Sequence, residues 1–151
     1  MTLRLHPGRV SGVVSAPSSK SHTHRAFILA ALSGNGSIRH ALESNDTQAT
    51  LDCLMRLGFL STVLPHETRI GGTFRPARDA LDARESGTTL RLMAGFAALQ
   101  PAKTSFIAAP GLAKRPMQPL LDALRQLGAA IPAGDTTTPF TIQGPIKGGE
   151  A

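Results

Sequence analysis

Two stretches of this sequence repeat one another, and this repetition limits the folds open to the chain more than any other feature. Residues 54–58, Leu-Met-Arg-Leu-Gly, match residues 124–128, Leu-Arg-Gln-Leu-Gly, in character. Residues 30–32, Ala-Ala-Leu, likewise match residues 97–99. The two matches are 70 and 67 residues apart, and similarity at nearly the same separation indicates two copies of one structural unit. The alternative is that helices ending in Leu-Gly are common to many α/β proteins, which would make the match a coincidence.

The first copy combines helix and strand signals. Loose alternation of polar and apolar residues over 9–16 predicts a strand that Pro17 ends. Polar residues from Ser19 lead into an apolar run that stops before Gly34, which predicts a helix. A second helix, capped by Asn45 or Asp46, is expected through Leu57. Three further strands are expected at 37–42, 60–64 and 67–70.

The second copy has the same order of signals. Ser86 is expected to cap a helix over 87–99, and a Pro-started helix is expected over 116–127. Residues 109–115 are expected to form a loop, and strands are expected at 104–108, 129–131 and 140–143. We therefore predict an α/β fold of two β-α-β-α-β-β units, at about residues 15–75 and 76–145.

Composition narrows the class of protein. The chain has 151 residues, of which 41% are hydrophobic and 17% charged, as expected for a globular domain rather than a disordered chain. It has neither an apolar run of about 20 residues nor a secretory signal pattern, so we expect a cytoplasmic location and no contact with a membrane. The single cysteine, Cys53, excludes an internal disulfide and is expected in the core.

The charge balance indicates small anionic ligands. Lys and Arg number 16 against 10 Asp and Glu, for a net charge of +6. The cations are spread thinly, and Trp and Tyr are absent, so we expect no nucleic-acid partner. His22 and His24 are two residues apart, which puts them on different sides of a helix. We therefore expect no metal and no cofactor.

Two predicted helix starts carry groups suited to an anion. Ser19, Lys20, Ser21 and Arg25 lie in the first turns of one helix, where free backbone N–H groups and the helix dipole attract negative charge. Ser21 and Arg25 share a face because they are four residues apart. The alternative is a serine cap beside a solvated arginine.

The other helix start repeats this arrangement. Ser86-Gly87-Thr88-Thr89 precedes Arg91, which lies three residues beyond Thr88 and so on the same face. Gly87 lets a ligand approach the backbone closely. Two such starts suggest two anionic groups.

These segments resemble a known family. Residues 18–26, 85–91, 114–117 and 121–129 are similar in order and spacing to motifs in the amino-terminal third of 5-enolpyruvylshikimate-3-phosphate (EPSP) synthases. The resemblance covers about residues 9 to 149. It implies an inverse α/β barrel, of whose six β-α-β-α-β-β units two are present. Residues 1–151 would then be the incomplete amino-terminal region of a two-domain enolpyruvyl transferase, with the missing carboxy-terminal domain as partner.

The resemblance also implies an activity and site residues. The family transfers the enolpyruvyl group of phosphoenolpyruvate to the 5-hydroxyl of shikimate 3-phosphate, in the shikimate pathway, through protonation of the enol carbon, attack by the hydroxyl and loss of phosphate. Lys20 is implied as the catalytic residue that contacts both substrates. Ser21 and Arg25 are implied on the shikimate side, and the phosphoenolpyruvate side is implied to comprise Gly87, Thr88, Arg91 and Arg115.

Departures from the family's pattern lead to further expectations. Glu85 would put a carboxylate beside an anion site, so we expect it to pair with a neighbouring arginine. Without the acidic residues of the second domain, the chain alone is expected to bind substrates weakly and to be inactive, with exposed apolar helix faces that favour self-association. The alternatives are a non-catalytic anion-binding module and a relative of UDP-N-acetylglucosamine enolpyruvyl transferase, although Ser21 and residues 112–113 differ from that enzyme's motifs.

Overall fold

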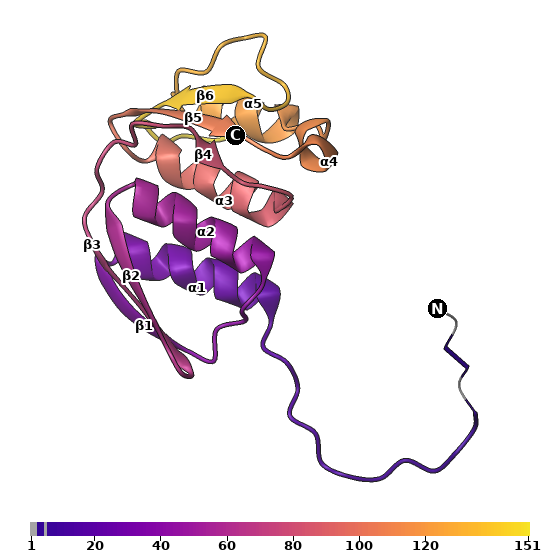
Figure 1. Ribbon diagram of the computed structural model, residues 1–151. Helices are drawn as coiled ribbons and strands as arrows, with labels where there is room; N and C mark the ends of the chain where they lie inside the picture. The colour runs from indigo at the N-terminus through magenta and orange to yellow at the C-terminus, as the bar shows by residue number, and fades with distance from the viewer. Residues whose placement is uncertain (1–2, 5) are drawn as a thin grey trace.

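The computed structural model describes residues 3–4 and 6–151 as a helical centre between two small sheets (Figure 1). The first half of the ordered chain contains α1 (Lys20–Leu32), β1 (Asn35–Arg39), α2 (Asn45–Arg56), β2 (Phe59–Leu64) and β3 (Glu67–Gly72). The second half contains β4 (Leu81–Asp82), α3 (Gly87–Ala98), β5 (Lys103–Ile107), α4 (Pro110–Ala113), α5 (Gln118–Gln126) and β6 (Phe140–Gln143). The predicted mixture of helices and strands is confirmed.

The two sheets differ in direction. The first has the order β1-β3-β2 and is antiparallel throughout, with Ile38 opposite Thr68. The second has the order β4-β5-β6, in which β4 is parallel to β5, with Leu81 opposite Phe106, and β6 is antiparallel to β5. Helices α1, α2 and α3 lie roughly side by side between the sheets (Figure 1). The sheets therefore cover the helices from two sides.

Helix α3 lies at the centre of the core. Its Met93, Ala94 and Ala97 have no exposed surface. Alanines at these positions let neighbouring elements approach closely, and each large apolar side chain that is fully buried stabilises the fold by about 1.5–3 kcal/mol. The ring of Phe96 lies edge-on to that of Phe59, with centroids 5.7 Å apart, and so joins the two halves. One core includes side chains from both halves.

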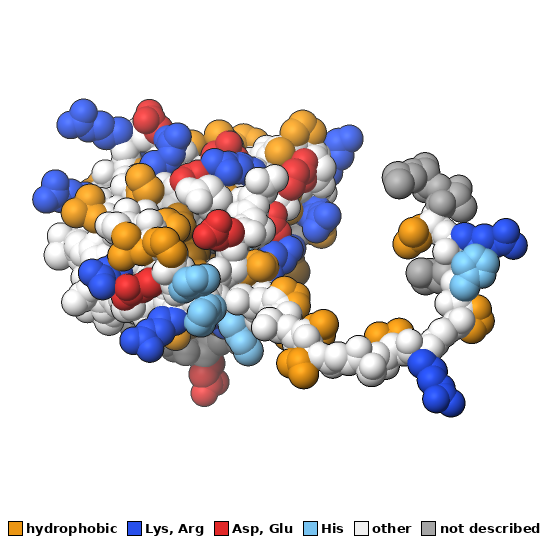
Figure 2. All heavy atoms as spheres, turned by 60° about the horizontal axis from the view of Figure 1, so that its bottom comes forward, with side chains coloured by type: hydrophobic (Ala, Val, Ile, Leu, Met, Phe, Trp, Pro, Cys, Tyr) orange, Lys and Arg blue, Asp and Glu red, His pale blue; other side chains and the backbone are white. Residues whose placement is uncertain are grey.

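The predicted strand over residues 9–16 is wrong. This segment has no regular secondary structure, and Figure 2 shows it standing clear of the body of the molecule. Val10, Val13 and Val14 are 99%, 101% and 90% exposed. Alternation alone cannot make a strand, because a strand is stable only when its backbone pairs with a neighbour. These residues pair with no strand of the described chain.

The second half corrects three further expectations. The expected loop contains the one-turn helix α4, which starts at Pro110, a residue suited to the first position of a helix. Helix α5 begins at Gln118 rather than Pro116, since the backbone N–H of Met117 donates to the carbonyl of Thr136. Of the strand expected at 129–131 only a bridge between Ala130 and Gln143 forms.

Helices α1, α2 and α3 each begin with a serine cap, and the cap of α2 differs from the prediction. Ser86 caps α3, as expected, and Ser19 caps α1. Helix α2 is capped by Ser44, one residue earlier than expected, and Thr47 completes a reciprocal capping box with it. Sequence reasoning named Asn45 or Asp46 because several good capping residues stand together here.

Exposed apolar surface on α1 agrees with the expectation from the sequence. Leu29 is 64% exposed and Leu32 is 49% exposed, although both belong to a helix that buries Phe27 on its other side. Cys53 is 1% exposed, so its expected place in the core is confirmed. Among the described residues, no helix combines the length and the apolar character that crossing a lipid bilayer requires.

Candidate anion-binding site

The amino-terminal ends of α1, α2 and α3 meet at one place. Asp46, in the first turn of α2, joins the other two helices: its side chain contacts Lys20 of α1, and its backbone carbonyl accepts a hydrogen bond from Thr89 of α3. Each helix start carries free N–H groups and the positive end of a helix dipole. Three such ends close together favour negative charge at this side of the molecule.

Lys20 is held at the start of α1. Its ammonium nitrogen lies 2.7 Å from a carboxylate oxygen of Asp46, and the two side chains are 50% and 30% exposed. An ammonium group has three protons, so Lys20 can donate to a ligand while keeping Asp46. At this exposure the ion pair stabilises the fold by at most about 1 kcal/mol. Its main effect is to orient Lys20.

The start of α3 brings together three of the predicted phosphoenolpyruvate residues. The Arg91 guanidinium donates to the carbonyl oxygen of Gly87 at 3.2 Å. A Cβ atom at position 87 would lie 2.9 Å from Nη1 of Arg91 and 3.9 Å from Nη1 of Arg115. Both guanidinium groups therefore lie beside a backbone without a side chain, and a bulkier residue here would crowd Arg91. Thr88, the fourth predicted residue, is half-buried beside them.

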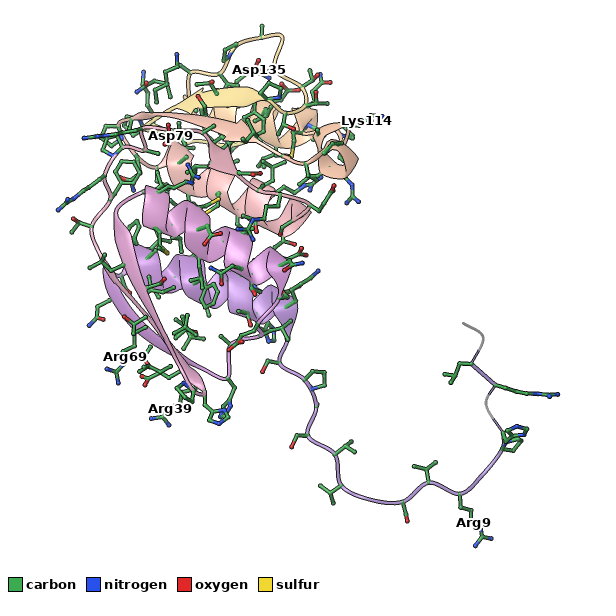
Figure 3. The ribbon with its side chains drawn as sticks, in the orientation of Figure 1. Arg9, Arg39, Arg69, Asp79, Lys114 and Asp135 are labelled. Atoms are coloured by element: carbon green, nitrogen blue, oxygen red, sulfur yellow. The ribbon has the colours of Figure 1, made fainter. Side chains whose placement is uncertain are left out.

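Arg115 approaches the start of α3 from a different segment of the second half. It follows α4, and Leu112 of α4 packs with a methyl group 3.5 Å from where a Cβ of Gly87 would be. Leu112 is 1% exposed, so its burial fixes α4 against the start of α3. Figure 3 shows the neighbouring Lys114 beside α4, far from Arg39 and Arg69 at the tip of the first sheet.

Glu85 does not form the ion pair expected from the sequence. Its carboxylate accepts a hydrogen bond from the backbone N–H of Gly111 at 3.1 Å, and the ion pairs found among the described residues do not include it. A Cβ at position 111 would lie 2.7 Å from Oε2 of Glu85. The first turn of α4 offers free N–H donors to this carboxylate, which explains its choice of partner. Glu85 thus helps to hold the segment that carries Arg115.

The structure places Ser21 and Arg25 on an exposed face of α1, one turn apart. Their side chains form no hydrogen bond within the part of the chain that the structure describes. Both are therefore available to a ligand, but no contact joins them to the Arg91 and Arg115 pair. Sequence spacing predicted the face that they share, and the structure agrees.

Sequence reasoning missed a buried polar group behind the site. His24, fully buried on α1, has Nδ1 2.7 Å from the hydroxyl of Thr50. That hydroxyl lies 2.8 Å from the hydroxyl of Thr89. Burial lowers the pKa of His24, and the positive charge of Lys20 lowers it further, while Asp46 opposes both. The sequence signal was a histidine four residues after a lysine, which alone says nothing about burial.

The arrangement can bind anions with two or more charged groups. It combines ammonium and guanidinium cations, free helix N–H groups and an unobstructed glycine backbone. Asp46 and Glu85, the two carboxylates identified at this end, are engaged with Lys20 and Gly111. Charge neutralisation and orientation of anions are therefore what these side chains supply.

Comparison with known proteins identifies relatives. The sequence pattern of the EPSP synthase (3-phosphoshikimate 1-carboxyvinyltransferase) family matches residues 5–151. The chain is 41% identical to the 3-phosphoshikimate 1-carboxyvinyltransferase of Methanocorpusculum labreanum over 99% of its own length and 37% of that protein. It is 42% identical to that of Carboxydothermus hydrogenoformans, over 89% of this chain and 33% of that protein.

Solved structures agree with the sequence relatives. An EPSP synthase from Acinetobacter baumannii superposes on 89% of this chain and 32% of its own with a TM-score of 0.82, at 29% sequence identity. The chain thus spans about a third of the length of the relatives that it matches. The family pattern and the sequence relatives match nearly all of this chain, and the fold agrees, so the chain belongs to the EPSP synthase family.

Proposed function

We propose that this chain provides the amino-terminal part of an enzyme that transfers the enolpyruvyl group of phosphoenolpyruvate to the 5-hydroxyl of shikimate 3-phosphate. The observation that carries the proposal is the placing of Arg91 and Arg115 beside the Gly87 backbone at the start of α3. Phosphoenolpyruvate carries a phosphate and a carboxylate, and two guanidinium forks suit two such groups.

We propose for the individual residues the roles that the family resemblance implies. Gly87, Thr88, Arg91 and Arg115 would bind phosphoenolpyruvate at the start of α3. Lys20, joined to α3 through Asp46, would contact both substrates as the catalytic residue. Ser21 and Arg25, exposed on one face of α1, would hold the carboxylate side of shikimate 3-phosphate.

The chain by itself would bind rather than catalyse. Addition to the enol carbon requires a proton donor, and Asp46 and Glu85 are already engaged by Lys20 and Gly111. The proton donor and the other contacts to the substrates would come from the remaining two thirds of the enzyme. That missing part is therefore the main proposed partner, and the cytoplasmic location expected from the sequence remains a prediction.

A titration of the chain with phosphoenolpyruvate, followed by amide proton–nitrogen spectra, tests the proposal. We expect saturable shifts at residues 87–91 and 115. Arg91→Ala should weaken binding about ten- to hundredfold, because a hydrogen bond to a charged group contributes about 1.5–3 kcal/mol. Arg39→Ala is the matched control, since it removes the same charge at the far tip of the first sheet (Figure 3).

Two results would count against the proposal. Equal losses in both arginine variants would mean that net charge, not a site, attracts the ligand. The second result is an assay in which the remaining part of an EPSP synthase is added to the chain. If the chain then binds its ligand normally but no enolpyruvyl transfer occurs, a non-catalytic anion-binding module is favoured instead.

A further inference from the structure

A closed ring of contacts joins the starts of α1, α2 and α3 beneath the proposed substrate site. It runs from His24 on α1 to Thr50 on α2, with 2.7 Å between Nδ1 and the hydroxyl oxygen. It continues to Thr89 on α3, with 2.8 Å between the two hydroxyl oxygens. Thr89 contacts the Asp46 carbonyl at 3.1 Å, and the Asp46 carboxylate binds Lys20 of α1 at 2.7 Å.

The ring passes through groups that the proposed site depends on. Thr89 lies two residues after Gly87, and its hydroxyl is 2.7 Å from the hydroxyl of Ser86, which caps α3. Lys20 closes the ring on α1. Any change in the middle of the ring therefore acts on the start of α3 and on the ammonium group of Lys20 together.

The direction of the hydrogen bonds follows from which atoms can donate. The hydroxyl of Thr89 has a single proton, which it donates to the Asp46 carbonyl or to the Ser86 hydroxyl, so none is left for Thr50. Thr89 then accepts from Thr50, and Thr50 accepts from an N–H at Nδ1 of His24. The other ring nitrogen, Nε2, is buried and has no partner among the described residues. A bare lone pair is tolerated there better than an unpaired N–H donor, which also favours the proton on Nδ1.

We propose that His24 is a positioning residue of the substrate site, which fixes the start of α1 relative to the start of α3 by donating to Thr50 and through it to Thr89. This inference rests on the proposed function, since it concerns ligands that touch both helices. His24 touches no reacting group: its effect passes through the threonines. Its side chain is fully buried, so it is not a ligand of the substrates.

The position of α1 gives this ring its importance. No strand of the described chain precedes α1 in a sheet, whereas β4 precedes α3 and pairs with β5. Side-chain contacts must therefore orient the start of α1. A ligand held by Lys20 together with Arg91 and Arg115 requires a fixed position of the start of α1 relative to the start of α3. An ion held at α3 alone does not require it.

The test compares two ligands in matched variants of this chain. Thr50→Val removes the central hydroxyl with little change in shape, and His24→Leu removes the donor. Both should weaken phosphoenolpyruvate binding about fivefold, the effect of losing one neutral hydrogen bond, and leave inorganic phosphate binding within about twofold. His24→Asn, which presents an amide N–H in the region of Nδ1, should restore phosphoenolpyruvate binding.

Imidazole nitrogen spectra provide a second measurement that does not depend on ligand. We expect the neutral form with the proton on Nδ1 at pH 7. A proton on Nε2 or a charged imidazolium would overturn the proposed direction of the ring.

The outcomes are distinct from those that test the proposed function. If the unaltered chain fails to bind phosphoenolpyruvate, the proposed function fails and the positioning role falls with it. If the unaltered chain binds and the folded Thr50→Val and His24→Leu variants bind equally well, only the role of His24 is overturned. Equal losses for phosphoenolpyruvate and phosphate, or no rescue by His24→Asn, would also overturn it.

Discussion

The two halves of this chain fix the start of their first helix by different means. In the second half, β4 pairs with β5, and Leu81 and Ala83 are 0% and 1% exposed just before α3. In the first half, the residues before α1 are exposed and pair with no described strand. Helix α1 is held instead by side chains: Thr23 accepts from the backbone N–H of Leu42, and Lys20 binds Asp46. Similar helix starts can thus be built on a backbone pairing or on a few polar contacts.

The difference also appears in what the helices bury. Helix α1 buries Thr23 and His24 near its start, whereas α3 buries Leu90 and Met93 after Thr89. Buried polar groups require partners in fixed directions, and apolar groups do not. The start of α1 is consequently set by specific hydrogen bonds, whereas the start of α3 combines the buried hydrogen bonds of Ser86 and Thr89 with apolar packing.

The largest expected effect on stability distinguishes the segment that precedes α3 from the segment that precedes α1. Leu81→Ala should lower the free energy of unfolding by about 2–5 kcal/mol, as is usual for a fully buried leucine. Val14→Ala should change it by less than about 0.5 kcal/mol, because Val14 is exposed. Urea unfolding measures both. Comparable losses in the two variants would mean that residues 9–16 pack on the body of the protein in solution.

A smaller effect is expected from the polar contacts of α1. Thr23→Val would leave the N–H of Leu42 without its acceptor and should cost about 1–3 kcal/mol in the free energy of unfolding. Thr104→Val on β5 is the matched control, because the Thr104 hydroxyl is buried without a partner among the described residues. It should be neutral or stabilising in the same urea experiment. A harmless Thr23→Val would contradict the view that hydrogen bonds orient α1.

The smallest effect is expected at Cys53 of α2, where the first half of the chain contacts β4 of the second half. We call this contact between Cys53 and Asp82 the seam. The Cys53 sulfur lies 3.5 Å from the carbonyl oxygen of Asp82 on β4. Burial, together with the negative charges of Asp52 and Asp82, raises the pKa of the thiol from its ordinary 9.0 to about 12. We expect no measurable alkylation by iodoacetamide at pH 8 in the native protein, since the thiolate is the reactive form. The unfolded chain in urea should react readily and serves as the control.

The same pKa difference predicts the sign of a pH effect. The folded state holds the thiol proton more tightly than the unfolded state. The resulting contribution to stability is complete below about pH 9 and is lost as the pH rises toward 12. Cys53→Ala should remove this part of the alkaline loss. Rapid alkylation at pH 8 would show that the two halves separate at this seam.

Much of the site could be predicted from local sequence. The starts of two helices, at Ser19 and Ser86, could be predicted, because a polar residue before an apolar run stabilises a helix start through local interactions. Thr88 and Arg91 were predicted to share a helix face, since they are three residues apart. The Arg115 side chain entered only through the family resemblance, as nothing local connects residue 115 to residue 87.

Other features depended on contacts between distant residues. The strand at 9–16 was predicted from alternation and did not form, whereas β4, only two residues long, formed because β5 offers it an edge. Glu85 was expected to pair with an arginine and instead accepts from Gly111 at the start of α4. Each outcome was set by which backbone groups lay within reach.

The sequence by itself determined the three central helices, the cap of α3 and the cationic residues, because these depend on interactions within a few residues of one another. The tertiary structure alone decided that Asp46 holds Lys20, that Arg115 reaches the start of α3, and that His24 is buried against Thr50. These contacts join segments about 25 or more residues apart, and their geometry follows from the packing of α1, α2 and α3 as one core.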